Sequence, residues 1–453
     1  MRTKLFLELK GLDQASAVEL ILDAGEVYER DQQTDEQARK IAMVLDYHPL
    51  ALTIASSLIR SAIFSIQECV DALGKRLMQK DVLSTESEQA RYQTVSATFE
   101  VSAESLQRLA STDASAGSAL ALLDMLGFMH HHDVSEVMFV RAWNFEKVVL
   151  AEYGNDGGEK DGDIEHLSAW HVTQCQAGLS SSPPDERLRL FRKARAHLER
   201  LSLISVDQVA KNMSLHSMVH AWARDRVGHA DEAWTAAAST LALSSEGDIA
   251  WRPSSSLLAR QYESSFGLFQ DIGSIQIEQR ELCRILYAYA WQMYRASSVC
   301  TVSICTTLLQ STKELSRNPW EKLSVTEARY ILAIAQQQDG QIREAVEMLE
   351  HVVKVREKLA EDHPSRLASQ HALAGAYRAN GQIDEAVEML EHVVKVEEKL
   401  AEDHPSRLAS QHALAGAYRA NGQIDEAVEM LEHVVKVKAV SYTHLTLPTK
   451  RIV

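Results

Sequence analysis

The chain has 453 residues, of which 45% are apolar and 24% are charged, and its formal net charge is −16. This balance is ordinary for a soluble globular protein, and the length allows about three domains. The negative charge disfavours nucleic acid and other anionic partners, while the scarcity of prolines and β-rich runs predicts a mostly helical fold.

Five cysteines are scattered along the chain, and none of them forms a C-x-x-C motif. This odd, dispersed set indicates reduced thiols in a cytosolic core rather than a disulfide framework. No apolar run has the length of a membrane span, and the run after Met1 is too short for a signal peptide. We therefore expect a cytoplasmic protein. The cysteines are Cys69, Cys175, Cys283, Cys300 and Cys305.

Residues 1–105 are predicted to form a helical domain. Residues 5–9 fit either a short strand or an entry segment, and Gly11-Leu12-Asp13 then caps a first helix. A second helix starts near Thr34 and stops at Tyr47-His48-Pro49, where a third helix begins.

Two segments of this domain resemble motifs of NB-ARC proteins, a branch of the STAND class of switch ATPases. Gly11–Asp13 is similar to the GLD segment of that family, and Tyr47–Leu52 is similar to its Gly-Leu-Pro-Leu-Ala motif. In the family the motif's proline packs against the nucleotide base, so the resemblance assigns that role to Pro49. The alternative is that Pro49 only begins a helix, as prolines commonly do.

Residues 106–230 are predicted to form a winged-helix domain. Its expected elements are helices at 116–129, 134–143 and 186–201 and strands at 202–206 and 213–217, with a turn at 211–212.

The end of this domain carries a second resemblance to the same family. Leu215-His216-Ser217 is similar to the Met-His-Asp motif, with Leu and Ser in place of Met and Asp. The histidine of that motif senses the diphosphate of bound ADP, which assigns this role to His216. The alternative is a structural histidine.

The helix predicted at 186–201 is basic, and two interpretations remain open. In a winged helix such a helix can enter the major groove of DNA. In a switch ATPase the same side chains would instead contact an acidic neighbouring domain. The basic residues are Arg187, Arg189, Arg192, Lys193, Arg195 and Arg200.

Two features that suggest metal binding do not predict a metal site. Residues 154–163 are rich in Gly and Asp but lack EF-hand spacing, which favours a disordered insertion. The adjacent side chains of His130-His131-His132 point in different directions on any regular element, so a mononuclear site is not expected.

A phosphate loop of the form G-x-x-x-x-G-K-[ST] is absent from the sequence. The nearest string, Gly74-Lys75-Arg76, has Cys69 in place of the first glycine and an arginine in place of the magnesium-binding hydroxyl. Leu120–Asp124 mimics a Walker B strand but lies in helical sequence. Without a phosphate cradle, phosphoryl transfer has no electrostatic basis. We expect no enzymatic activity and no cofactor in this chain; the resemblance implies ADP or ATP in an intact protein of which this is an N-terminally truncated fragment.

Residues 231–320 are expected to form a degenerate helical bridge, and residues 321–439 form repeats. The block 358–396 recurs letter for letter at 399–437, and a more divergent copy precedes it at 340–364. Each unit predicts a helical hairpin, with Pro364 in the first turn of helix A, Asn380-Gly381 at the corner, and helix B running to about Ala401. The pattern resembles kinesin-light-chain-like tetratricopeptide repeats, and implies an α-solenoid that binds a protein or peptide.

Side chains of helix A that point away from helix B would line the concave groove of such a solenoid. By resemblance these are His371, Arg378, His412 and Arg419. One interpretation is a groove for an acidic peptide segment; the other is a solvated helix face. The unit 358–398 is itself acidic, which argues against nucleic acid as its partner.

The helix-B pattern breaks at Lys438-Ala439, and residues 440–453 are unlike the repeats. We interpret this segment as a translated sequencing adapter, the alternative being a disordered tail. The identity of two repeats at surface positions indicates recent duplication or an assembly error, because packing does not demand it.

These patterns predict the regulatory and ligand-sensing fragment of a STAND-type nucleotide-switch protein. Its expected fold is mostly α: a helical domain and a winged helix followed by a tetratricopeptide solenoid. Possible self-association follows from the resemblance, and no membrane partner is expected. The alternatives are a stand-alone tetratricopeptide adaptor and a winged-helix transcription regulator.

Overall fold

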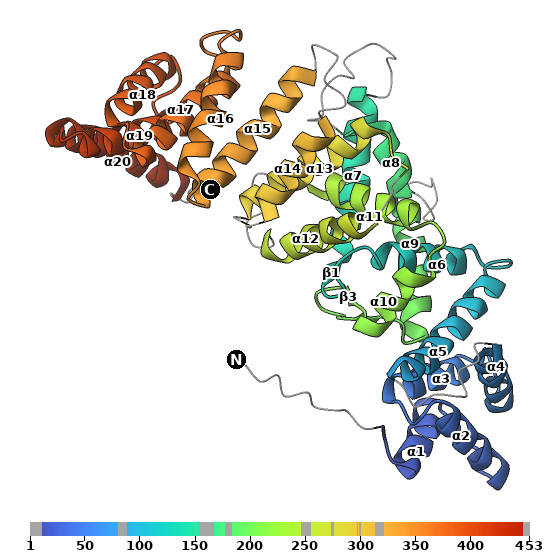
Figure 1. The fold of residues 1–453 in the computed structure, drawn as a ribbon. Helices are drawn as coiled ribbons and strands as arrows, with labels where there is room; N and C mark the ends of the chain where they lie inside the picture. Colours follow the sequence, from blue (N-terminus) through green and yellow to red (C-terminus); the bar gives the residue numbers. More distant parts are fainter. Residues whose placement is uncertain are drawn as a thin grey trace, which may run out of the picture. The chain divides into compact units, whose positions relative to one another are not determined.

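The computed structural model is mostly helical and divides into two compact units (Figure 1). The first comprises Met1–Gly157 and Leu167–Ile277, and the second comprises Gly158–His166 and Glu278–Val453. The predictions for 5–9 and 154–163 fall outside the residues that the structure describes. Those residues are 11–79, 88–153, 167–176, 184–245, 255–272, 276–296, 298, 300–312 and 321–446.

The described residues bear on the predictions about the cysteines and about membrane spans. All five cysteines are free, and four of them are buried. Within the ranges given above, the structure has no helix with the length and apolar character needed to cross a membrane.

The first unit begins with a group of helices in which Asp13 caps the first helix and Pro49 begins the third, as the sequence predicts. The Asp13 carboxylate accepts hydrogen bonds from the backbone N–H groups of Ala15 and Ser16, both at 3.0 Å, and so begins the first helix. The backbone N–H of Leu12 donates to the Tyr47 carbonyl at 3.0 Å, which places the two segments of the NB-ARC resemblance side by side. The helices are α1 (Gln14–Ala24), α2 (Gln32–Val44), α3 (Pro49–Arg60), α4 (Ile66–Gln79) and α5 (Glu88–Leu109).

The next segment combines helices with a small antiparallel sheet. Val134 pairs with Met213, which in turn pairs with Val206, so the strand order is β1-β3-β2. The rings of Phe139 and Trp143 pack on Phe191 with centroid distances of 4.8 and 5.7 Å. The elements are α6 (Ala114–Leu126), β1 (Val134–Ser135), α7 (Glu136–Tyr153), α8 (Ala169–Gln176), α9 (Pro184–Arg200), β2 (Ser205–Val206) and β3 (Asn212–Ser214).

Two sequence predictions for this segment need correction. Val134 and Ser135 were assigned to a helix but form β1, because the buried Val134 joins the ladder opposite Met213. The last strand ends at Ser214 rather than at 217, because His216 already caps the helix α10 (Ser217–Arg226).

The predicted bridge at 231–320 is divided between the two units. Helices α11 (Ala230–Ser245) and α12 (Ser255–Asp271) belong to the first unit, where α11 packs against α7 and α8. Helices α13 (Gln279–Arg295) and α14 (Cys300–Thr312) belong to the second, where α14 packs against the first repeat helix.

Three helical hairpins follow, as the repeats predict. Gly381 closes helix A of the second hairpin with a left-handed φ of +86°, and Pro364 occupies its first turn. Helix B ends at Glu397 rather than near Ala401, because the Leu400 N–H bonds back to the Glu397 carbonyl and tightens the chain into a turn. The helices are α15 (Glu321–Gln338), α16 (Ile342–Arg356), α17 (Pro364–Asn380), α18 (Ile383–Glu397), α19 (Pro405–Ala420) and α20 (Ile424–Thr446).

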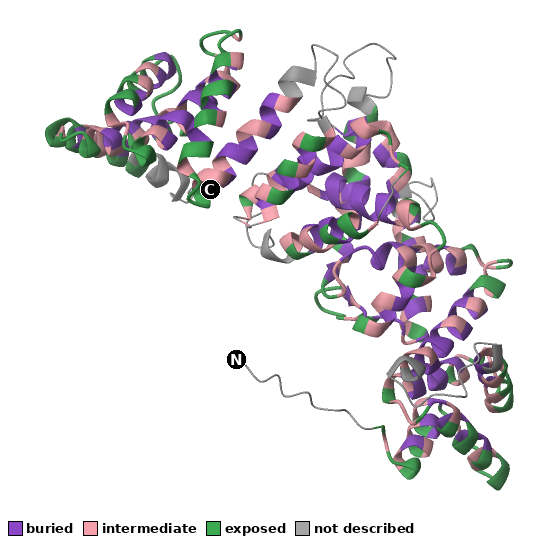
Figure 2. Ribbon diagram, in the orientation of Figure 1, coloured by how far each residue is buried: buried purple, intermediate pink, exposed green. Residues whose placement is uncertain are grey.

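The hairpins pack through a buried seam that consists of two apolar clusters, and Figure 2 shows the buried residues of the repeat helices in purple. Ala374 and Ala386 are both fully buried in it, and their small side chains allow the helices to cross closely. Helix α20 runs into the segment assigned to the tail, since it continues to Thr446. The seam members of the second and third hairpins are Ala374, Ala386, Val387, Leu390, Val394, Leu414 and Ala417.

Candidate functional site

The four predicted groove residues occupy equivalent positions in two successive A helices. His371 and Arg378 lie in α17, and His412 and Arg419 follow one repeat later in α19. A spacing of seven residues is two helical turns, so each pair shares one helix face. His371 is half-buried, whereas the other three are exposed.

Arg378 extends from its own helix to the next hairpin. A Cβ on Gly416 would collide with Nη1 of Arg378, so this guanidinium lies against the bare backbone of α19. The first and second hairpins meet at the preceding junction, between α15 and α17. There Gln337 lies in the same way near Gly375, and a Cβ added to Gly375 would be 3.5 Å from Nε2 of Gln337. The glycine position therefore lets a long side chain bridge neighbouring A helices, and the second junction places a positive charge there.

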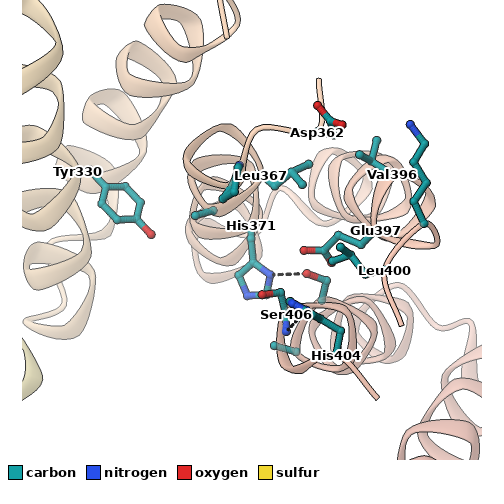
Figure 3. Close-up of a pocket in the computed structure, with 14 residues that line it drawn as sticks. Tyr330, Asp362, Leu367, His371, Val396, Glu397, Leu400, His404 and Ser406 are labelled. Atoms are coloured by element: carbon teal, nitrogen blue, oxygen red, sulfur yellow. Dashed lines mark hydrogen bonds between the residues drawn. The ribbon is translucent and has the colours of Figure 1, made fainter. Parts of the chain in front are cut away.

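Behind this face a cavity of about 450 Å³ opens between the N-terminal halves of α17 and α19 (Figure 3). His371 lines it, as does the turn that joins α18 to α19. The lining also includes Tyr330, Asp362, Leu367, Ala368, Val396, Glu397, Lys399, Leu400, His404 and Ser410.

Three polar side chains form a chain of hydrogen bonds along one wall. His371 Nδ1 lies 3.2 Å from the Ser410 hydroxyl oxygen, and Ser410 is also hydrogen-bonded to the Glu397 carboxylate. A hydroxyl hydrogen serves one strong acceptor, so Ser410 donates to Glu397 and accepts from His371. Burial and, after it, the charge of Arg378 lower the pKa of His371, which keeps its imidazole neutral.

Glu397 is a buried carboxylate that sequence reasoning did not single out. It is 4% exposed, its Oε2 has no hydrogen-bond partner, and none of the ion pairs among the described residues includes it. Burial raises the pKa of Glu397, against the opposing effects of Ser410 and His404. A position-by-position comparison of the repeats would have found it, because it lies one residue beyond the identical block.

At the preceding junction, where the first hairpin meets the second, the side chain of Arg356 fills the equivalent space. Arg356 occupies the position of Glu397 one repeat earlier, is 1% exposed, and forms an ion pair with Glu327 of α15. Its Nη1 donates to the Ser365 carbonyl at 2.8 Å, and its guanidinium lies 4.7 Å from the centroid of the Tyr330 ring. Here the inter-repeat space holds a cation, a carboxylate and an aromatic ring.

The two residues assigned to nucleotide binding lie at helix N-termini of the first unit. Pro49 is exposed at the start of α3, and His216 is exposed as the cap of α10. His216 Nδ1 accepts from the Met218 N–H at 3.2 Å, which leaves the proton of a neutral ring on Nε2. A donor at Nε2 suits a phosphate oxygen. Among the described residues, no hydrogen bond or ion pair joins Pro49 to His216.

Three arginines of the basic helix α9 form ion pairs with carboxylates of its own unit. Arg192 and Arg195 both bind Glu136 at 2.6 Å, and the buried Arg187 binds Glu146 at 2.5 Å. Both carboxylates belong to α7. These three arginines are therefore paired with the adjoining helix, and the contacts with DNA or with an acidic neighbouring domain stay predictions.

The histidine triplet lies close to His216 and His220. The rings of His131 and His220 are 5.5 Å apart, and burial followed by the neighbouring histidines lowers the pKa of His131. Over the described ranges, no group of three or more His, Cys, Asp or Glu side chains is arranged to hold a metal ion.

The repeats match a known family. A family model described as a tetratricopeptide repeat matches residues 324–399 and 368–439. No curated protein matches the chain. Among solved structures, the nearly identical TPR-like repeats of a Podosopora anserina protein described as a kinesin light chain share 38% identity, cover 41% of this chain and 88% of that one, and give a TM-score of 0.34.

Two further solved structures are more distant. BtubC from P. vanneervenii shares 13% identity, with 49% of this chain and 86% of that one covered and a TM-score of 0.37. A STAND protein with a tetratricopeptide repeat sensor from Pyrococcus horikoshii shares 12% identity, with coverage of 96% and 61% and a TM-score of 0.32. The family match and the helical hairpins together show that residues 324–439 of this chain are tetratricopeptide repeats.

Proposed function

We propose that the tetratricopeptide hairpins bind an acidic peptide segment of a protein partner. Tetratricopeptide repeats generally serve protein–protein interaction, and the carrying observation is that Arg378 bridges from α17 to the backbone of α19 at Gly416. Together with Arg419 one repeat later, it places guanidinium groups along the A helices. Guanidinium groups bind carboxylates with paired hydrogen bonds.

A charge reversal tests this proposal. Peptides selected from a random library on the full chain should be enriched in Asp and Glu, and Arg378→Glu with Arg419→Glu should weaken their binding by about tenfold or more. The matched control reverses two exposed cations of the B helices, Arg343→Glu with Lys395→Glu, and should leave binding within about twofold. Equal losses in the two double variants would contradict a groove on the A helices.

We further propose that the chain is the regulatory and ligand-sensing part of a STAND-type switch protein. In support, the order helix–strand–helix–helix–strand–strand with an antiparallel three-stranded sheet is that of a winged helix, although α8 is inserted in it. The close packing of Gly11 on the Asp46 and Tyr47 carbonyls ties together both segments of the NB-ARC resemblance. Partner binding would then bias a two-state equilibrium that ADP holds in its inactive state.

In this proposal the intact protein supplies the phosphate loop, while Pro49 and His216 contribute the base contact and a hydrogen-bond donor to the diphosphate. The present chain then has neither ATPase activity nor specific ADP affinity. Isothermal calorimetry of the full chain with ADP should show no saturable heat, and micromolar affinity would overturn this part. Sequencing the transcript upstream of Met1 is the second test: a phosphate loop supports the switch, and a stop codon close to Met1 supports the adaptor.

A further inference from the structure

The junction between the second and third hairpins differs from the preceding one at three aligned positions. Glu397 stands where Arg356 does, Ala368 where Glu327 does, and His371 where Tyr330 does. Each replacement is smaller than its counterpart. The space that Arg356 fills at the first junction is therefore a cavity of about 450 Å³ at the second.

The walls of this cavity offer hydrogen-bond acceptors. Glu397 Oε2 is buried without a partner. Because Ser410 takes the Nδ1 hydrogen of His371, the Nε2 of the neutral ring is also an acceptor. A buried, unpaired carboxylate is costly in an isolated protein, and a cation that enters the cavity would relieve the cost.

We propose that this cavity binds the guanidinium group of an arginine side chain presented by the partner peptide. The chain supplies its own precedent, since Arg356 satisfies a buried carboxylate in the same inter-repeat space one hairpin earlier. Leu367, Val396 and Leu400 line the cavity with apolar surface that suits the methylene stem of arginine.

The remaining charged groups of the lining are consistent with a cationic occupant. Asp362 adds a second carboxylate. Lys399 is exposed to solvent, and His404 Nδ1 is occupied as the acceptor for the Ser406 N–H at 3.2 Å. Neither side chain forms an ion pair with Glu397 within the described part of the chain.

This inference rests on the proposed groove and adds to it. The acidic segment would lie along Arg378 and Arg419, and a single arginine of the same peptide would enter beside His371. The partner would therefore carry an arginine anchor next to its acidic residues.

The test uses peptides selected from a random library on the full chain and resynthesised with either arginine or citrulline, its neutral isostere. Citrulline should weaken binding by about tenfold or more, as expected for loss of a charged hydrogen-bonded pair. Glu397→Gln should abolish this discrimination while retaining the shape of the side chain. Discrimination that persists in Glu397→Gln, or selected peptides without an arginine preference, would overturn the proposal.

A second variant tests the proposal even if Glu397→Gln fails to fold. Ala368→Glu with Glu397→Arg transplants the ion pair of the first junction, so it should fold normally and exclude the arginine peptide. Undiminished binding in this variant contradicts the proposal. The affinity of free argininamide tests whether the ligand is a peptide or a small molecule. If argininamide binds as tightly as the peptide does, the proposal that a peptide supplies the arginine is wrong. Peptides that depend on Arg378 but not on Glu397 would refute the inference and leave the proposed groove intact.

Discussion

The junctions on either side of α17, where successive hairpins meet, have nearly identical B helices but fill the space between the hairpins differently. At the first, Arg356 and Glu327 are buried against each other and fill the space between hairpins. At the second, Glu397 is buried without a cation beside a cavity. Three aligned positions decide whether a junction is closed or open. Arg356 and Glu397 differ on the B helices, and Glu327 and Tyr330 of the divergent helix α15 stand where α17 has Ala368 and His371.

The largest expected effect comes from opening the closed junction. Arg356→Met leaves Glu327 buried without its partner and should cost about 3–5 kcal/mol of local stability. Because the chain has two units, native-state hydrogen exchange of amides in α15 to α17 is the suitable measurement. Arg343→Met, at an exposed position, should change these amides by less than about 0.5 kcal/mol. A small effect of Arg356→Met would mean that the ion pair is not needed to close the junction.

The converse change at the open junction should stabilise the protein. Glu397→Leu replaces a buried carboxylate, one oxygen of which has no hydrogen-bond partner, with an apolar side chain of similar size. It should add about 1–3 kcal/mol of stability, read from amides in α17 to α19. The same variant should lose the arginine peptide. A loss of stability would show that Glu397 supports the fold rather than a ligand.

The two junctions should also differ in their response to pH. The pKa of Glu397 is raised above 4.5, so its folded form holds a proton more tightly than the unfolded chain does. Stability of the second junction should therefore be highest below that value and should fall as pH rises through the raised pKa. Hydrogen exchange of α19 at a series of pH values should show this trend in the parent and not in Glu397→Gln.

His371 contributes the opposite trend. Its pKa is lowered from 6.5, so its contribution is present above 6.5 and is lost as pH falls through the lowered pKa. His371→Gln should remove that part of the pH profile and leave the part that belongs to Glu397. A profile without the acidic-side loss would indicate that His371 is hydrated rather than buried.

The smallest expected change in stability concerns the glycine turns between helix A and helix B, which all three hairpins share. Gly381 has a φ of +86°, and Gly381→Ala should cost about 1 kcal/mol because a Cβ is strained there. Gly74 lies within helix α4 with open space around it, so Gly74→Ala should instead stabilise its own unit by about 0.5–1 kcal/mol. The same sign for both would contradict the left-handed corner.

The sequence predicted the hairpins well, because Pro364, the small residues at the crossings and the glycine corners act locally. It assigned Arg378 and Arg419 to the A-helix face, which stays a prediction, and it could not foresee that Arg378 reaches Gly416. The strand at Val134 was missed, since two residues carry no periodicity and the pairing with Met213 is long-range. The cavity was also missed, because it arises from substitutions on separate helices that become neighbours only after stacking.

The central claim is that a partner's side chain enters the open junction of the repeats. Hydrogen–deuterium exchange of the full chain, with and without an arginine-containing selected peptide, tests it most directly. The account predicts new protection at the start of α17, in the turn after Glu397 and at the start of α19, and none at the Arg356 junction. Protection confined to the B helices, or equal protection at both junctions, would contradict it.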